Sequence, residues 1–129
     1  MRPARPERPL RHGVAFVAVT PEREVLLRRR PLKGLLGGMV EVPCSEWRGE
    51  PWSAAEARQA APLAARWRTL APAVEHGFTH FRLELTVKVA EVRQRPVAAG
   101  FWWPIADLHR QPLPTVIKKV LRAGFQYGE

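Results

Sequence analysis

From Phe81 to Ala90 the chain alternates apolar with polar or small residues without a break. The two alternating sets are Phe81, Leu83, Leu85, Val87 and Val89 against Arg82, Glu84, Thr86, Lys88 and Ala90. A period of two is that of a β-strand, whose successive side chains point to opposite faces of a sheet. We therefore expect a strand over residues 81–92 with one buried face and one face in water.

Three further strands are expected. Residues 13–20 (GVAFVAVT) are apolar on both faces, as in the central strand of a sheet, and residues 25–28 follow after a turn. Residues 101–104 (FWWP) predict a short aromatic strand that ends at a proline.

Helices are expected in three places. Residues 53–65 are rich in good helix formers, with Ser53 and Glu56 spaced as a capping box and Pro62 at the expected end. Residues 105–109 predict a helical turn, and residues 114–123 an amphipathic helix with Gly124 past its end. Together the elements predict an α+β fold, a mixed β-sheet flanked by helices.

Composition limits the function classes. The 129 residues correspond to one domain, and 46% hydrophobic residues are enough for a core. The single cysteine, Cys44, excludes an internal disulfide, a four-cysteine zinc site and a four-cysteine iron–sulfur cluster within these residues, and favours a cytoplasmic setting. Apolar runs are too short for a membrane-spanning helix, so no membrane partner is expected.

The chain is strongly basic, with a net charge of +9. Such an excess favours a polyanionic partner, although a merely basic surface gives the same sum. Residues 1–12 (MRPARPERPLRH) interleave arginine and proline, which predicts an extended linker before a domain at 13–129, or an ordinary frayed terminus.

Two segments offer candidate binding residues. In the first, Phe78, Thr79 and His80 precede the long strand and combine a ring with hydrogen-bonding groups, as a nucleobase pocket requires. The alternative is that the rings pack and the imidazole satisfies backbone groups. In the second, Arg28, Arg29, Arg30 and Lys33 are candidate phosphate contacts, the alternative being a solvated charged face.

The sequence gives little support for catalysis within these residues. One Asp and 11 Glu are scattered and none adjoins another acidic residue, whereas Mg²⁺-dependent phosphohydrolysis needs clustered carboxylates. Cys44 follows Pro43 without a neighbouring base. We therefore assign no catalytic residue and no metal ligand.

Three motifs in order resemble the C-terminal domain of MutY-type adenine DNA glycosylases. They are VLLRRRP-KGLLGGMVEVP (residues 25–43), HGFTHF (76–81) and LPTVIKKVL (113–121). The resemblance covers about residues 10–125. It implies a Nudix-like fold, a mixed sheet flanked by helices.

The resemblance also implies a role in DNA repair. That domain helps the enzyme to recognise 8-oxoguanine opposite the adenine to be removed from 8-oxoG:A and G:A mispairs in double-stranded DNA. By this resemblance Thr79 contacts the N7/O8 edge of the lesion, Phe78 wedges beside it, and His80 holds the loop or contacts the base. Thr79 stands where the family usually has serine.

The same resemblance places the chemistry elsewhere. A preceding glycosylase domain of the same protein would remove the adenine and carry the iron–sulfur cluster, and residues 1–12 would be the linker to it. The glutamate-rich metal box of active Nudix enzymes does not match, because its first glutamate position, counted from Gly38, falls on Cys44 and its Arg-Glu pair on Trp52-Ser53. This domain, without a cofactor of its own, would discriminate substrate while its parent is the enzyme. A free-standing Nudix-type nucleotide pyrophosphohydrolase and a protein-interaction module of a repair complex stay as alternatives.

Overall fold

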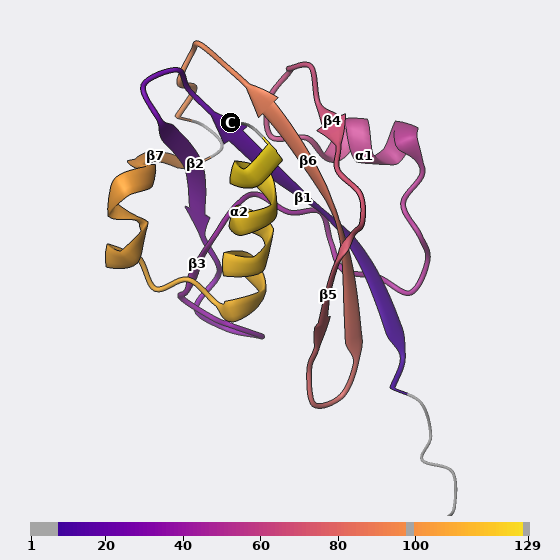
Figure 1. The fold of residues 1–129 in the computed structure, drawn as a ribbon. Coiled ribbons are helices and arrows are strands. Elements are labelled where there is room, and N and C mark those ends of the chain that lie inside the picture. The colour runs from indigo at the N-terminus through magenta and orange to yellow at the C-terminus, as the bar shows by residue number, and fades with distance from the viewer. Residues whose placement is uncertain (1–7, 98–99, 128–129) are drawn as a thin grey trace, which may run out of the picture.

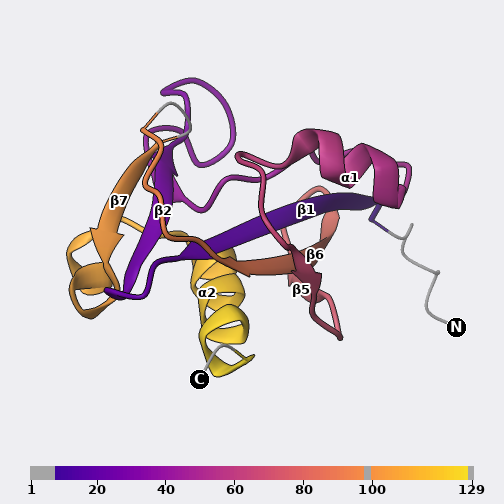
Figure 2. The ribbon, with the colours of Figure 1, turned by 90° about the horizontal axis from the view of Figure 1, so that it is seen from above.

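The computed structural model describes residues 8–97 and 100–127, which form a mixed sheet with helices on both faces (Figures 1 and 2). Five strands follow the order β3-β2-β1-β6-β4, while β5 pairs with β6 and β7 with β2. The strands are β1 (Leu10–Val19), β2 (Glu24–Arg29), β3 (Val40–Glu41), β4 (Arg68–Thr69), β5 (Val74–Gly77), β6 (Arg82–Glu91) and β7 (Phe101–Pro104). The helices are α1 (Ala54–Ala60), η1 (Ile105–Arg110) and α2 (Thr115–Tyr127). The α+β expectation is confirmed.

Strand β1 is the centre of the sheet, as its apolar sequence predicted. It runs parallel to β6 and antiparallel to β2. One side contributes Ala15 and Val17 to the main core, which also includes the buried residues of α2. The other side contributes Val14 and Phe16 to a second cluster with Ala57 of α1. Figure 2 shows the two helices on opposite sides of β1, so both faces of this strand are excluded from water.

The alternation along β6 is confirmed with one exception. Its apolar set is buried in the main core, and its first polar residue, Arg82, is exposed. Ala90, expected on the wet face, is buried with Ala18, Leu26 and Val92 against the half-buried rings of Trp67 and Trp102. The opposite face of the sheet therefore has a small core of its own at this end, which the alternation alone does not indicate.

Helix α1 begins where the sequence predicted it and ends just before Pro62, the expected end. The Ser53 side chain accepts from the Glu56 N–H and the Glu56 carboxylate accepts from the Ser53 N–H, so the capping box is confirmed. The helix ends at Ala60 because Pro62 disfavours helical backbone at the preceding residue, and Ala61 is extended.

Helix α2 continues past Gly124, so the prediction that this glycine follows the helix is wrong. Gly124 is buried, and a Cβ at this position would lie 3.1–3.3 Å from three side-chain carbons of Val17 on β1. The glycine is present because the helix backbone approaches the sheet closely here.

Of the remaining expected elements, those at residues 101–110 are confirmed, and the linker at residues 1–12 is shorter than expected. The short strand and helical turn at residues 101–110 are confirmed. Strand β1 starts at Leu10, so residues 10–12 of the expected linker belong to the sheet, and residues 1–7 lie outside the described part of the chain. In the described ranges no helix is long and apolar enough to cross a membrane.

Candidate functional site

The loop that was singled out from the sequence is the tip of the β5–β6 hairpin, which extends beyond the other strands (Figure 1). The last strand pair is Gly77 with Arg82, and the Phe78 N–H donates to the Phe81 carbonyl at 2.8 Å, which closes a tight turn. Thr79 and His80 lie between them and are exposed. The hairpin therefore presents a hydroxyl and an imidazole to solvent at its end.

An aromatic cluster lies directly behind these exposed residues. It consists of Trp47, His76, Phe78 and Phe81. Phe78 is stacked on Phe81 with ring centroids 4.8 Å apart. The centroid of its ring also lies 5.9 Å from that of Trp47 and 4.9 Å from that of His76, the latter pair in a T-shaped arrangement. Ring contacts from several directions restrict the rotamers of Phe78, so the base of the tip is rigid.

His76 is held in the neutral form. Its Nδ1 lies 3.1 Å from the Lys119 ammonium of α2. Burial, and then the positive charge of Lys119, lower the pKa of the His76 imidazole. Since the ammonium can only donate, Nδ1 accepts and the ring proton is on Nε2.

A concave surface, the arginine groove, adjoins the aromatic cluster. Its volume is about 540 Å³. It is lined by Arg11, Arg28, Arg29, Arg30, Pro31, Leu35, Glu41, Cys44, Ser45, Glu46 and Trp47. Trp47 belongs to both surfaces: the Arg30 guanidinium lies 4.7 Å above its ring, and Arg11 lies 4.3 Å above Phe81. Four guanidinium groups therefore lie next to the hairpin tip.

Glu41 organises this groove and was not identified from the sequence. Its side chain is 2% exposed and accepts from Arg28 Nε at 2.7 Å and from Arg30 Nη1 at 2.6 Å. Arg28 also donates to the Cys44 carbonyl. The β2–β3 register places Glu41 opposite Arg28, but a two-residue strand such as β3 gives no periodic signal that could have predicted it.

The structure brings together most of the predicted binding residues. Arg28, Arg29 and Arg30 line one groove beside the loop of residues 78–80. Only Arg29 of the three is exposed, and it donates to the Gly38 carbonyl. Lys33 is exposed in the loop between β2 and β3 and does not line the groove. Arg11 and Trp47, which do contribute, lie outside the three motifs.

The residues at the Nudix metal positions do not fit a magnesium ion. Cys44 is buried, and burial raises the pKa of its thiol, so it is neutral. Glu56 of α1 is bound to the Ser53 N–H and to Arg48. Within residues 8–97 and 100–127 no three His, Cys, Asp or Glu side chains group as metal ligands. Mg²⁺ prefers several oxygen ligands, which this donor set does not supply.

Comparison with known proteins identifies the fold family. A family model described as NUDIX domain matches residues 14–123. The C-terminal domain of mouse MUTYH, solved in complex with human PCNA, aligns with a TM-score of 0.67 and 21% identity over 92% of this chain and 88% of that chain.

Two other solved structures are similar. The MutT protein of Methanosarcina mazei Go1 has a TM-score of 0.69 and 16% identity over 97% of this chain and 99% of that chain. The Nudix domain of Shewanella oneidensis NrtR, complexed with ADP ribose, has a TM-score of 0.72 and 14% identity over 98% and 91%. At these identities the likeness is one of fold. No curated protein sequence matches the chain significantly.

Proposed function

We propose that the chain, which belongs to the Nudix family, is the lesion-recognition domain of an adenine DNA glycosylase. In this role it recognises 8-oxoguanine opposite adenine in double-stranded DNA. The observation that carries the proposal is the hairpin tip, where Thr79 and His80 are exposed on a rigid aromatic base beside four arginines. A tip of this kind can enter a groove or a gap in a base stack, while the arginines neutralise phosphates.

The chemistry of Thr79 suits the lesion. Guanine presents an acceptor at N7, whereas 8-oxoguanine presents an N7–H donor next to the O8 acceptor. A hydroxyl both accepts and donates, so Thr79 can pair with this edge of the damaged base. The imidazole of His80 adds a second hydrogen-bonding group at the same tip, and Phe78 provides a fixed ring beside them.

The arginine groove suits the sugar–phosphate backbone. Guanidinium groups bind phosphate in a bidentate manner and stay charged at all physiological pH values. Arg28 and Arg30 are oriented by the buried Glu41 carboxylate. Such contacts position a duplex without reading its sequence, which leaves discrimination to the tip.

In this proposal adenine removal belongs to a glycosylase domain of the same protein. The residues before β1 would join it to the present domain, and the iron–sulfur cluster would lie within it. The C-terminal domain of mouse MUTYH was solved in complex with human PCNA, so a domain of this fold can also contact a protein partner.

The proposal is tested by the lesion preference of loop variants. We expect Thr79→Ala to reduce the preference for an 8-oxoG:A duplex over a G:A duplex by about 1–3 kcal/mol, the usual contribution of a good base contact. Thr79→Ser keeps the hydroxyl and should retain most of the preference. Fluorescence anisotropy with both duplexes measures the ratio of dissociation constants.

Histidine variants provide the matched control. His80→Ala should weaken lesion binding, whereas His109→Ala, at an exposed position on η1, should leave it unchanged. A lesion preference that Thr79→Ala and His80→Ala leave intact would disprove the assignment of the loop. Turnover of 8-oxo-dGTP in the presence of Mg²⁺ by the purified chain would instead favour the nucleotide pyrophosphohydrolase.

A further inference from the structure

A second basic surface adjoins the aromatic cluster at His76. We call it the Lys119 pocket; its volume is about 240 Å³. It is lined by Arg8, Leu10, Glu75, His76, Gly77, Arg82, Leu83 and Lys119. Three permanent cations therefore surround one carboxylate, and the pocket shares no lining residue with the arginine groove.

The donors of this pocket are held in place. The Lys119 ammonium lies 3.2 Å from the Glu75 carbonyl and 3.1 Å from His76 Nδ1, so it bridges α2 and β5. Because His76 Nδ1 accepts, its Nε2–H remains as a neutral donor. Because its ammonium is already held in place, Lys119 loses little side-chain entropy when an anion binds.

Arg8 completes one wall of the pocket. It donates to the Phe78 carbonyl at 2.5 Å, and its guanidinium atoms lie 3.4–3.8 Å from where a Cβ of Gly77 would be. The Arg8 guanidinium therefore lies close to the hairpin backbone at Gly77 and Phe78. Arg82, the pairing partner of Gly77, is exposed and adds a second guanidinium.

The position of Phe78 relates the two basic surfaces. Its ring contacts Trp47, which lines the arginine groove, and also His76, which lines the Lys119 pocket. The base of the tip therefore connects two separate sets of cations. A hairpin that contacts one nucleotide of a strand lies close to the two backbone phosphates that flank that nucleotide, so two separate phosphate sites are useful to it.

We propose that the Lys119 pocket binds a backbone phosphate of the lesion-containing DNA strand, as a site separate from the arginine groove. This inference rests on the proposed function and assigns a second phosphate site, formed where the motifs at residues 76–81 and 113–121 meet. The ligand class is a DNA phosphodiester, contacted by Lys119, Arg82 and Arg8.

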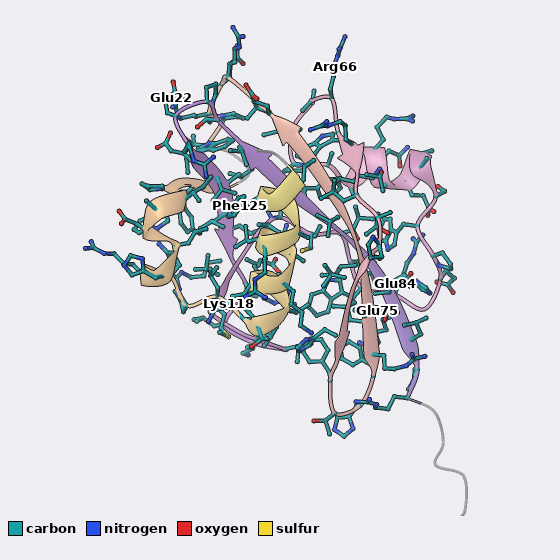
Figure 3. The ribbon with its side chains drawn as sticks, in the orientation of Figure 1. Glu22, Arg66, Glu75, Glu84, Lys118 and Phe125 are labelled. Carbon is teal, nitrogen blue, oxygen red and sulfur yellow. The ribbon has the colours of Figure 1, made fainter. Side chains whose placement is uncertain are left out.

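The test measures the salt dependence of duplex binding. The test variants are Lys119→Gln and Arg82→Gln, and the control variant is Lys118→Gln. Lys118 is an exposed neighbour of Lys119 on α2 and does not line the pocket. Figure 3 labels Lys118, together with Glu75 of the hairpin. All three variants remove one positive charge. We expect each of Lys119→Gln and Arg82→Gln to weaken binding of the 8-oxoG:A duplex and of the G:A duplex by equal factors, because a phosphate contact does not distinguish the two bases. Each should reduce the slope of log K against log salt by about 1, the loss of one phosphate contact.

The outcomes separate this inference from the proposed function. In one outcome the lesion preference depends on Thr79, but the salt slopes of Lys119→Gln and Arg82→Gln equal that of Lys118→Gln. This result overturns the phosphate site and leaves lesion recognition in place. Reduced slopes without any lesion preference support the site and overturn lesion recognition. If the chain binds neither duplex, both fail. Stabilisation by inorganic phosphate with unchanged slopes also counts against a DNA site.

Discussion

Glu41 is a carboxylate taken out of water, and its two arginine partners are the reason that it can be charged there. A buried charge without a partner costs several kcal/mol, so each hydrogen bond to the carboxylate stabilises the fold. The same bonds orient Arg28 and Arg30 along the groove. One buried residue therefore serves both the stability of the domain and the geometry of its candidate phosphate surface.

Replacing one of these arginines should be costly for stability. We expect Arg30→Gln to lower the free energy of unfolding by about 2 kcal/mol, the usual loss for a hydrogen bond to a charged group. Lys33→Gln removes the same charge from an exposed loop position and should change it by less than about 0.5 kcal/mol. Urea denaturation measures both, and equal stabilities would contradict the role given to Glu41.

The neutral His76 ring should make the domain sensitive to mild acid. The pKa of His76 is lowered in the folded state, first by burial and then by Lys119, from an ordinary value of 6.5. Between the lowered pKa and 6.5 the unfolded state binds more protons than the folded state, so stability falls as the pH falls through this window.

Substitution of His76 tests that linkage. We expect His76→Gln to lose less stability than the wild type when the pH is lowered from 7 to 5, since glutamine does not titrate. Thermal or urea unfolding at a series of pH values measures the difference. A wild type and a variant with the same pH dependence would show that the ring is not held neutral by its surroundings.

At the scale of elements, helix α2 fixes the position of Lys119 relative to the hairpin. The helix packs on β1 at Gly124 and reaches β5 through the Lys119 contacts with Glu75 and His76. A change in the distance between helix and sheet would therefore also alter the Lys119 pocket. The close approach at Gly124 is the contact that sets this distance.

Enlarging Gly124 should separate helix and sheet. A Cβ there would be 3.1–3.3 Å from Val17, a β-branched residue with little rotamer freedom. We expect Gly124→Val to reduce the free energy of unfolding by about 1–3 kcal/mol, as overpacked cores do. Arg122→Val, at an exposed position of the same helix, should cost under about 1 kcal/mol. Calorimetric melting distinguishes the two, and a Gly124→Val chain as stable as the wild type would refute the packing argument.

Elements with a local signal were predictable from the sequence. The alternation of β6, the two-sided apolar run of β1 and the capping box of α1 all depend on residues close together in the chain. The burial of Ala90 and the position of Gly124 inside α2 were not predicted correctly. Each depends on a neighbour from another strand or helix, here Trp102 and Val17.

In the candidate site, too, features made of contiguous residues could be predicted from the sequence, and features that depend on contacts between distant residues could not. The loop of residues 78–80 and the arginine run could be named from the sequence, because each is contiguous. Their proximity could not, since Trp47 and Arg11 join them through contacts between distant parts of the chain. Glu41 and the Lys119 pocket were missed for the same physical reason.

At the scale of the molecule, part of the positive charge behind the net +9 is concentrated in the arginine groove and the Lys119 pocket. The groove arginines and the pocket cations form two separate surfaces, each in contact with the aromatic cluster at the base of one hairpin tip. A duplex bound there would have its phosphates contacted by both surfaces. Since counterion release scales with the number of phosphates neutralised, binding should weaken steeply with salt.

The central claim is that these 129 residues by themselves distinguish 8-oxoguanine from undamaged guanine. The most direct measurement is the affinity of the purified wild-type chain for duplexes that differ only in 8-oxoguanine against guanine opposite adenine, at one fixed salt concentration. We predict tighter binding of the 8-oxoguanine duplex, with most of the difference lost in Thr79→Ala. Equal affinities of the wild type for the two duplexes would contradict the account.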